Sequence, residues 1–247
     1  AGTEDATSQT NTYRNTAITV ADITATSDTS LKSITYNHIT GRLKGEEVAD
    51  YTANYNSAGD VVSTAVYVYD VSGVDTLAAL AASDDLNSKV MTYRGTVTTA
   101  PGAVLKSITY NDIAGRLKGE EIADYTENFN TAGSVTTTAT YFYLVGTDLK
   151  RAADAGTEDL NSELHTYRGQ IRPATADARL AGLKSITYNR TSGLVKGEEI
   201  ADYTENFNAS QQVATVTVYF YGDSDVRASA AGTEDATSQT NTYRNTA

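Results

Sequence analysis

Repeated carboxylates are the first candidates for chemistry in this sequence. The tetrad Lys-Gly-Glu-Glu occurs at 44–47, 118–121 and 196–199, and an aspartate follows each copy. Paired carboxylates at a fixed separation can perform acid–base hydrolysis. Three identical sites in series favour architecture instead, because charged side chains on strand edges discourage wrong pairing. We therefore expect structural roles for the repeated lysine and first glutamate, which are Lys44, Lys118, Lys196, Glu46, Glu120 and Glu198. Cross-strand ion pairing is the favoured interpretation, with contacts between repeat units or a Lys–Asn cross-link as alternatives.

The two histidines, His38 and His165, fall at unrelated places in the repeated sequence. A catalytic or metal-binding histidine needs partners at fixed spacing, and the sequence offers none. We expect both to be exposed, variable positions. Cysteine is absent, which excludes disulfides, thiolate zinc sites and cysteine nucleophiles. The sequence therefore predicts no enzyme, no catalytic residue, no cofactor and no metal site.

Acidic clusters recur as Gly-Thr-Glu-Asp at 2–5, 156–159 and 232–235, and as Ser-Asp-Asp at 83–85. Calcium loops need oxygen ligands at alternating positions followed by glycine, and these clusters lack that spacing. We expect them to be solvated turns or capping residues, with calcium as the alternative.

The net charge of the chain limits the classes of binding partner that we expect. The chain has 247 residues and a formal net charge of −12. Binding to nucleic acid or to anionic lipid rests on Lys and Arg, so we expect neither partner. No apolar run approaches the ~20 residues of a spanning helix, so we expect no membrane insertion.

Internal repetition is the dominant signal. Three blocks of forty residues begin at Leu31, Leu105 and Leu183, and the first two agree at 28 of 40 positions. A Thr-Tyr-Arg segment with an acidic lead precedes each block. The predicted units of about 75 residues are 1–73, 74–147 and 148–225, and 226–247 begins the next. One supersecondary unit has been copied.

The terminal segments are identical. The letters AGTEDATSQTNTYRNTA stand at 1–17 and again at 231–247, an offset of 230 residues. Block starts are 74 and then 78 residues apart, so the offset fits three units. We interpret the duplicate as the seam of a longer array, with an engineered duplication as the alternative. The two copies should occupy equivalent structural positions.

Strands dominate the expected structure. Apolar and polar residues alternate in segments such as 134–144, and Asn and Gly separate the segments. Each unit therefore predicts about four strands joined by short turns. The connectors 74–87 and 148–156 show apolar residues at helical spacing, so we expect short helices there.

Tyrosines recur within the blocks at steps of 15 and 16 residues. This near-constant step of one strand plus one turn predicts stacked rungs with aromatic residues at equivalent places. We therefore expect structural roles for the nine tyrosines Tyr36, Tyr51, Tyr67, Tyr110, Tyr125, Tyr141, Tyr188, Tyr203 and Tyr219.

The segments YNSAGDV at 55–61 and FNTAGSV at 129–135 share an aromatic residue, Asn, two residues, Gly and then Val two positions on. This pattern resembles the YD repeats of bacterial Rhs-type surface and secreted proteins. The third unit departs from it, because FNASQQV at 207–213 has Gln in place of Gly. The resemblance implies strand–turn rungs in large extracellular proteins.

The sequence thus predicts a mainly β fold, in which tandem repeats form an extended β-rich solenoid or fibre with short helical connectors. A string of small β-sandwich domains is the alternative. The expected function is structural, as a segment of an extracellular or cell-surface fibre, stalk or sheath. Its partners would be neighbouring copies of its own repeat, in the same polypeptide or in identical chains. The alternative function is a surface adhesin that binds glycans through exposed Tyr and Asn.

Overall fold

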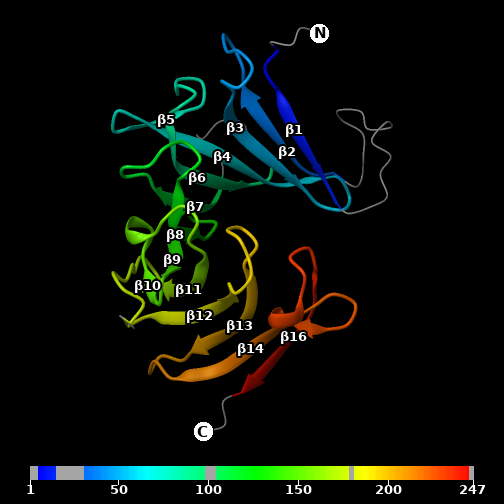
Figure 1. Cartoon of the computed structure of the whole chain (residues 1–247), viewed down its shortest axis with the longest axis vertical. Helices are drawn as coiled ribbons and strands as arrows, with labels where there is room; N and C mark the ends of the chain where they lie inside the picture. The colour runs from blue at the N-terminus through cyan, green and yellow to red at the C-terminus, as the bar shows by residue number, and fades with distance from the viewer. Residues whose placement is uncertain (1–4, 15–30, 98–103, 178–180, 245–247) are drawn as a thin grey trace. The chain divides into compact units, whose positions relative to one another are not determined.

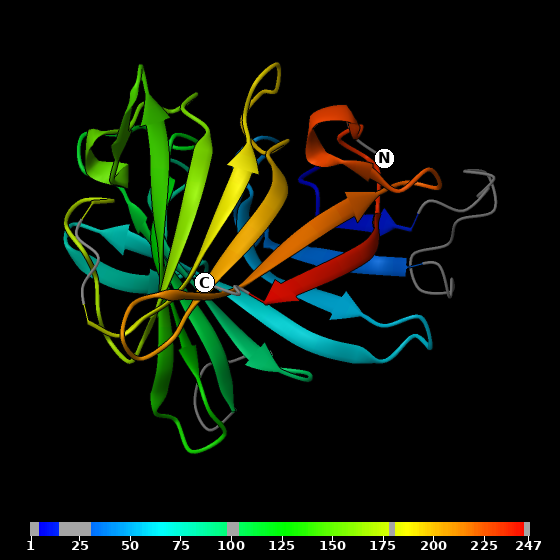
Figure 2. The same ribbon diagram turned by 90° about the horizontal axis from the view of Figure 1, so that it is seen from below.

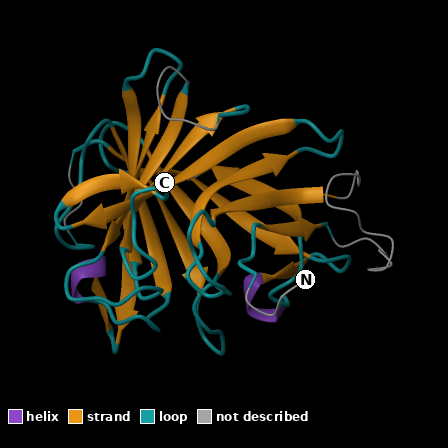
Figure 3. Cartoon of the chain, turned by 90° about the horizontal axis from the view of Figure 1, so that it is seen from above, coloured by secondary structure: helices purple, strands orange, loops and turns teal. Residues whose placement is uncertain are grey.

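A computed structural model describes residues 5–14, 31–97, 104–177 and 181–244. These residues form one antiparallel sheet of 16 strands (Figure 1). Figure 3 shows strands joined by loops, and the described residues contain no α-helix, only short 3₁₀ turns. The expectation of a mainly β fold is confirmed. No helix among the described residues is long and apolar enough to cross a membrane.

Four long strands recur in every unit, in the same chain order. We call the first of each set the lead strand, because it carries Thr-Tyr-Arg and precedes the block. The first set is β1 (Gln9–Tyr13), β2 (Leu31–His38), β3 (Val48–Tyr55) and β4 (Val61–Val71). The second set is β6 (Leu86–Arg94), β7 (Leu105–Asp112), β8 (Ile122–Phe129) and β9 (Val135–Val145). The third set is β11 (Asn161–Arg168), β12 (Leu183–Arg190), β13 (Ile200–Phe207) and β14 (Val213–Tyr221), after which β16 (Thr237–Arg244) is a fourth lead strand.

The predicted helix at 74–87 is wrong. The segment begins with β5 (Val74–Leu77), which folds back on β4 with Val74 opposite Val71. The two residues between these strands, Ser72 and Gly73, have φ of 54° and 84°. Positive φ at both central residues is the requirement of a tight hairpin turn whose twist matches its strands. The Ser-Gly pair therefore decides the structure here, and the apolar residues counted toward a helix are largely exposed, Leu80 at 77%.

The second connector has the same design. β10 (Asp148–Lys150) pairs with β9, and a 3₁₀ turn, η2 (Ala152–Asp154), follows it. The same design follows the third block, with β15 (Val226–Arg227) and η3 (Ala228–Ala230). One 3₁₀ turn spans three residues, so the alanine spacing that suggests a helix is satisfied by a single turn.

Small alanines in these turns pack on a tyrosine of the block. Ala78 and Ala81 lie against Tyr69, Ala152 and Ala155 against Tyr143, and Ala228 and Ala231 against Tyr221. Each cluster also contains the first residue of the second strand of its block, which is Val48, Ile122 or Ile200. Each connector therefore covers one end of its block, and the burial of apolar surface holds it in place.

Sequence neighbours are sheet neighbours. The long strands follow the chain in order from β1 to β14, and β5, β10 and β15 pair only beside the strand that precedes them. The described strands thus belong to one sheet and not to separate two-sheet sandwiches. Two compact units are recognised from the contacts: residues 1–121 with 129–133, and residues 122–128 with 134–247.

Candidate functional site

The contact between a lead strand and the block after it is the best candidate for a functional site, because it repeats three times. We call this contact the junction. In each copy the lead tyrosine stands opposite the first leucine of the block, as in Tyr93 with Leu105 and Tyr167 with Leu183. In all three pairs the ladder skips one residue of the block strand next to this contact, namely Lys32, Lys106 or Lys184. The junctions therefore share one register.

The second glutamate of Lys-Gly-Glu-Glu holds the start of the lead strand. The N–H of Asn87 donates to Oε1 of Glu121 at 3.0 Å, and the same carboxylate accepts the N–H of Gly119 at 2.8 Å. Glu47 accepts from Thr7 and Gly45, and Glu199 accepts from Asn161 and Gly197, in the equivalent way. In the first junction, the bond from the Thr7 N–H lowers the pKa of the Glu47 carboxyl.

An asparagine completes this end of the junction. Asn111 of β7 donates its side-chain amide to the carbonyl of Asn87 at 2.9 Å. Asn189 donates to Asn161 at 3.0 Å and Asn37 donates to Thr7 at 2.9 Å. The start of each of the three lead strands that precede a block is thus bound through both its N–H and its carbonyl.

The arginine of Thr-Tyr-Arg secures the other end of the lead strand. Arg94 donates to the carbonyl of Leu105 at 2.6 Å and to the carbonyl of Phe129 at 3.0 Å. Arg14 and Arg168 bridge the equivalent pairs of carbonyls. A guanidinium presents several donors in a fixed fork, so one side chain can satisfy two acceptors. Each arginine therefore joins its lead strand to the first and second strands of the block.

The predicted first glutamates and lysines lie in the turn beside this junction. The first glutamate accepts a backbone N–H three residues before it, as in Glu46 with Leu43 at 3.0 Å. Glu120 and Glu198 do the same. All three lysines, Lys44, Lys118 and Lys196, are exposed, and Lys118 donates to the carbonyl of Ser83. In the described residues these glutamates bind backbone N–H groups, where we expected ion pairs.

The predicted tyrosines fall on two faces of the sheet. Tyr36 stacks on Tyr51 with centroids 4.7 Å apart, and Tyr188 stacks on Tyr203 at 4.5 Å. Tyr110 of β7 and Tyr125 of β8 occupy the equivalent strand positions.

The third tyrosine of each block points to the opposite face, where its hydroxyl forms a hydrogen bond with a threonine hydroxyl. Tyr67 meets Thr52 at 2.9 Å. Tyr141 meets Thr126 at 3.1 Å and Tyr219 meets Thr204 at 2.9 Å. The phenol groups of this row are therefore engaged within the sheet.

The expectation that both histidines are exposed is wrong for His165. Its side chain is 1% exposed, lies 4.6 Å from Phe142 between ring centroids, and contacts Glu163 at 2.7 Å. Met91 occupies the equivalent place in β6 and is half-buried there. His38, at the end of β2, is half-buried.

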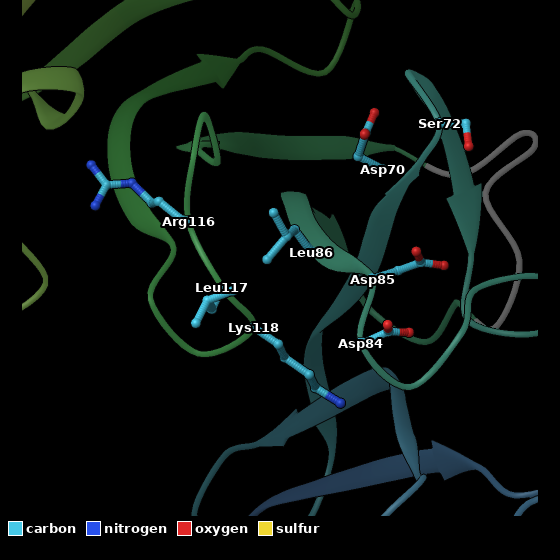
Figure 4. A pocket seen from close by; sticks show the side chains of 8 residues that line it. All are labelled: Asp70, Ser72, Asp84, Asp85, Leu86, Arg116, Leu117 and Lys118. Atoms are coloured by element: carbon cyan, nitrogen blue, oxygen red, sulfur yellow. The ribbon is translucent and has the colours of Figure 1, made fainter.

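An open cleft of about 550 Å³ lies beside the second junction (Figure 4). Asp84 and Asp85 line it from the loop before β6, and Arg116 and Lys118 line it from the loop after β7. Its charges are mixed, and the Asp85 carboxylate is occupied by the N–H of Ala82 at 2.6 Å.

The acidic clusters act as turn caps. Asp159 accepts the N–H of Gly156 at 2.7 Å, and Asp235 accepts that of Gly232 at 2.8 Å, as Asp85 accepts that of Ala82. Within the described ranges, no group of three or more carboxylates and histidines could hold a metal ion. The cluster at 2–5 lies largely outside the described residues.

Sequence reasoning missed a second row of tyrosines. Tyr69, Tyr143 and Tyr221 are buried, and each hydroxyl donates to the carbonyl of an alanine in the neighbouring strand. They recur at the block spacing, as the nine predicted tyrosines do, so the signal was present. The same strands carry Tyr67, Tyr141 or Tyr219 two residues earlier. The sequence prediction included only these earlier tyrosines.

Compared with known proteins, the chain matches no family model and no curated protein. The junction therefore has to be interpreted from its own geometry.

Proposed function

We propose that the chain is a structural protein, a segment of an extracellular or cell-surface fibre, stalk or sheath built from tandem repeats. The observation that carries this proposal is the repeated junction. Three lead strands are held in one register by the same glutamate, asparagine and arginine contacts. An interface that is identical at every step can extend a sheet by any number of units.

The other side of each lead strand supports the same proposal. β6 pairs with β4, β11 with β9, and β16 with β14, again in one register with one bulge. Figure 2 shows β16 in red alongside β14 in orange. Each lead strand is thus the element that joins one block to the next, and the net charge of −12 keeps neighbouring arrays apart. In this proposal, the repeats stack into an extended β-rich array of the kind that the YD-repeat resemblance implies.

Concatenated chains test this function. Chains carrying residues 1–230 once, twice and three times should increase in length by a constant step per copy, as measured by small-angle X-ray scattering and negative-stain microscopy. Compact molecules, whose radius of gyration grows only as about the 0.38 power of residue number, would overturn the proposal.

The same chains separate the structural role from the adhesin alternative. Tyr67→Ala removes a phenol that this alternative could use to bind sugars, while the junction residues remain. Binding to a glycan array that disappears in this variant would favour an adhesin. A structural protein gives no such signal and retains its length increments.

A further inference from the structure

The duplicated terminal segments form two strands of identical sequence that use opposite edges. β1 pairs with β2 and, among the described strands, with no other. β16 pairs with β14 and likewise has one partner in the described part of the chain. The internal lead strands β6 and β11 have a partner on each side. Each terminal copy therefore makes half of the pairing of a lead strand.

The two halves fit together in register. In β11, Glu163 stands opposite Phe142 of β9 and opposite Tyr188 of β12. Its counterpart in β16, Gln239, keeps the first pairing, with β14. The counterpart in β1, Gln9, keeps the second pairing, with β2. One strand of this sequence can therefore pair with β14 on one side and β2 on the other without any shift.

The exposed fraction of the lead tyrosine depends on how many neighbouring strands its own strand has. Tyr93 and Tyr167, which lie in strands with two partners, are 2% and 0% exposed. Tyr243 of β16 is 55% exposed, and Tyr13 of β1 is half-buried. A lead strand buries its tyrosine fully only where a strand lies on both sides, so β16 would gain apolar burial from a second neighbour.

We propose that β16 of one copy replaces β1 of a second copy beside β2, so that identical chains join head to tail. This inference rests on the proposed structural function and deepens it by naming the partner as a second copy of this chain. The exchange breaks one β1–β2 ladder and forms another of the same sequence and register, while Tyr243 becomes buried. Because the contact joins two different surfaces, it propagates into an open filament unless its geometry closes a ring.

Association entropy opposes the exchange, so it depends on protein concentration. The junction contacts remain available to the incoming strand. Arg244 is the counterpart of Arg14 and can reach the carbonyls of Leu31 and Tyr55 that Arg14 binds. Thr237 is the counterpart of Thr7 and can donate its N–H to Glu47 as Thr7 does.

Cysteine trapping tests the exchange, since the natural chain has no cysteine. One copy of the 247-residue chain carries Ser33→Cys in β2, and a second copy carries Thr242→Cys in β16. Thr12 stands opposite Ser33 in β1, and Thr242 takes its place after the exchange. Opposed Cα atoms lie about 4.5–5.5 Å apart, within the range that a disulfide spans. Mild oxidation of the mixture should give a covalent heterodimer whose yield rises with concentration.

Two matched variants make the result decisive. Asn241→Cys places the thiol on the opposite face of β16, and with Ser33→Cys it should give at most background cross-linking. A single chain with Thr12→Cys and Ser33→Cys should form the internal disulfide and shows that the site can oxidise. Equal yields from the Thr242→Cys and Asn241→Cys mixtures, with this internal disulfide intact, would refute strand exchange.

Arg14 of the strand that leaves and Arg244 of the strand that enters compete for the same two carbonyls. Removing one or the other should therefore shift the exchange in opposite directions. Arg14→Ala removes two charge-assisted hydrogen bonds from the strand that must leave, so it should raise the heterodimer yield at limiting concentration by about tenfold or more. Arg244→Ala weakens the strand that enters and should lower the yield. Edge-to-edge pairing that leaves β1 in place predicts no increase for Arg14→Ala and would also overturn the proposal.

The two proposals fail separately. Concatenated chains that lengthen regularly, together with absent heterodimers, would refute only the exchange between chains. Heterodimers formed by chains whose concatenated forms stay compact would refute the extended array instead.

Discussion

At the scale of single residues, the junction depends on side chains that bind backbone atoms. Glu121 is typical, since it accepts N–H groups from Asn87 and Gly119. Hydrogen bonds to a charged group contribute more than neutral ones, about 1.5–3 kcal/mol. The residue types indicated an architectural role for Lys-Gly-Glu-Glu but not its partner, because a carboxylate can pair with a lysine or cap a backbone with equal ease.

Replacing this carboxylate should loosen one junction. Glu121→Ala leaves two N–H groups without their acceptor, and we expect it to lower the free energy of unfolding by about 2 kcal/mol, measured by urea denaturation. Glu121→Gln keeps an acceptor and should lose less. The exposed Lys118→Ala is the matched control, and a loss from it as large as that from Glu121→Ala would argue for the ion pairing that we first expected.

Buried phenols make the protein sensitive to alkali. Burial raises the pKa of Tyr51, Tyr69, Tyr93, Tyr188 and Tyr203 above the ordinary value of 10.0. A raised folded-state pKa means that the stabilisation is complete below pH 10 and is lost as pH rises through the folded-state values.

We therefore expect cooperative unfolding above pH 10, with the late part of the tyrosinate absorbance rising together with the loss of strand circular dichroism. Complete titration of all tyrosines with an unchanged dichroism spectrum would contradict the burial described here.

At the scale of elements, alternation and Asn-Gly turns were sufficient to predict the long strands, whereas the connectors were mispredicted. Apolar spacing alone does not distinguish a helix from a hairpin followed by a 3₁₀ turn. The deciding signal was local: Ser72 and Gly73 both adopt positive φ. The register and the side-chain partners of each junction could not be predicted, because a single sequence does not specify which atoms two paired strands place side by side.

The hairpin turn between the second and third strands of the block gives a reciprocal test. Gly133 has φ of 79° with nothing near its missing Cβ, and Gln211 holds the equivalent place in the third unit with φ of 61°. Left-handed backbone costs a non-glycine residue about 1 kcal/mol. Gln211→Gly should therefore raise the free energy of unfolding by about 1 kcal/mol, and Gly133→Gln should lower it by a similar amount.

Thermal denaturation of both variants measures this effect. The two changes in free energy should be opposite in sign and should nearly cancel in the double variant, because the two turns belong to different repeats and act independently. A stabilising Gly133→Gln would show that side-chain contacts, and not backbone strain, control this turn.

At the scale of the whole molecule, the strand order makes stability a sum of neighbouring contacts. Each long strand contacts the strands next to it in sequence, so opening can begin at either edge. Composition and repetition predicted this one-dimensional character before any strand could be paired. The equivalence of β1 and β16 depended on register, which only the structure supplies.

Amide hydrogen exchange should detect the difference in stability between edge strands and internal strands. Amides of β1 and β16, which have one partner each, should exchange faster than those of β6 and β11, which have two. The lead strands have related sequences, so they serve as internal controls for intrinsic exchange rates. Equal protection in all four would mean that the sheet opens only as a whole.

The main-chain character of the junction also affects how such a protein can change over time. Arginine and asparagine bind carbonyls, and glutamate binds N–H groups, which every residue except proline can offer. A block therefore accepts any lead strand that keeps its register, whatever its other side chains are. Units can be shuffled, lost or multiplied without redesigning their neighbours, which leaves the exposed positions free to diverge while the joint stays the same.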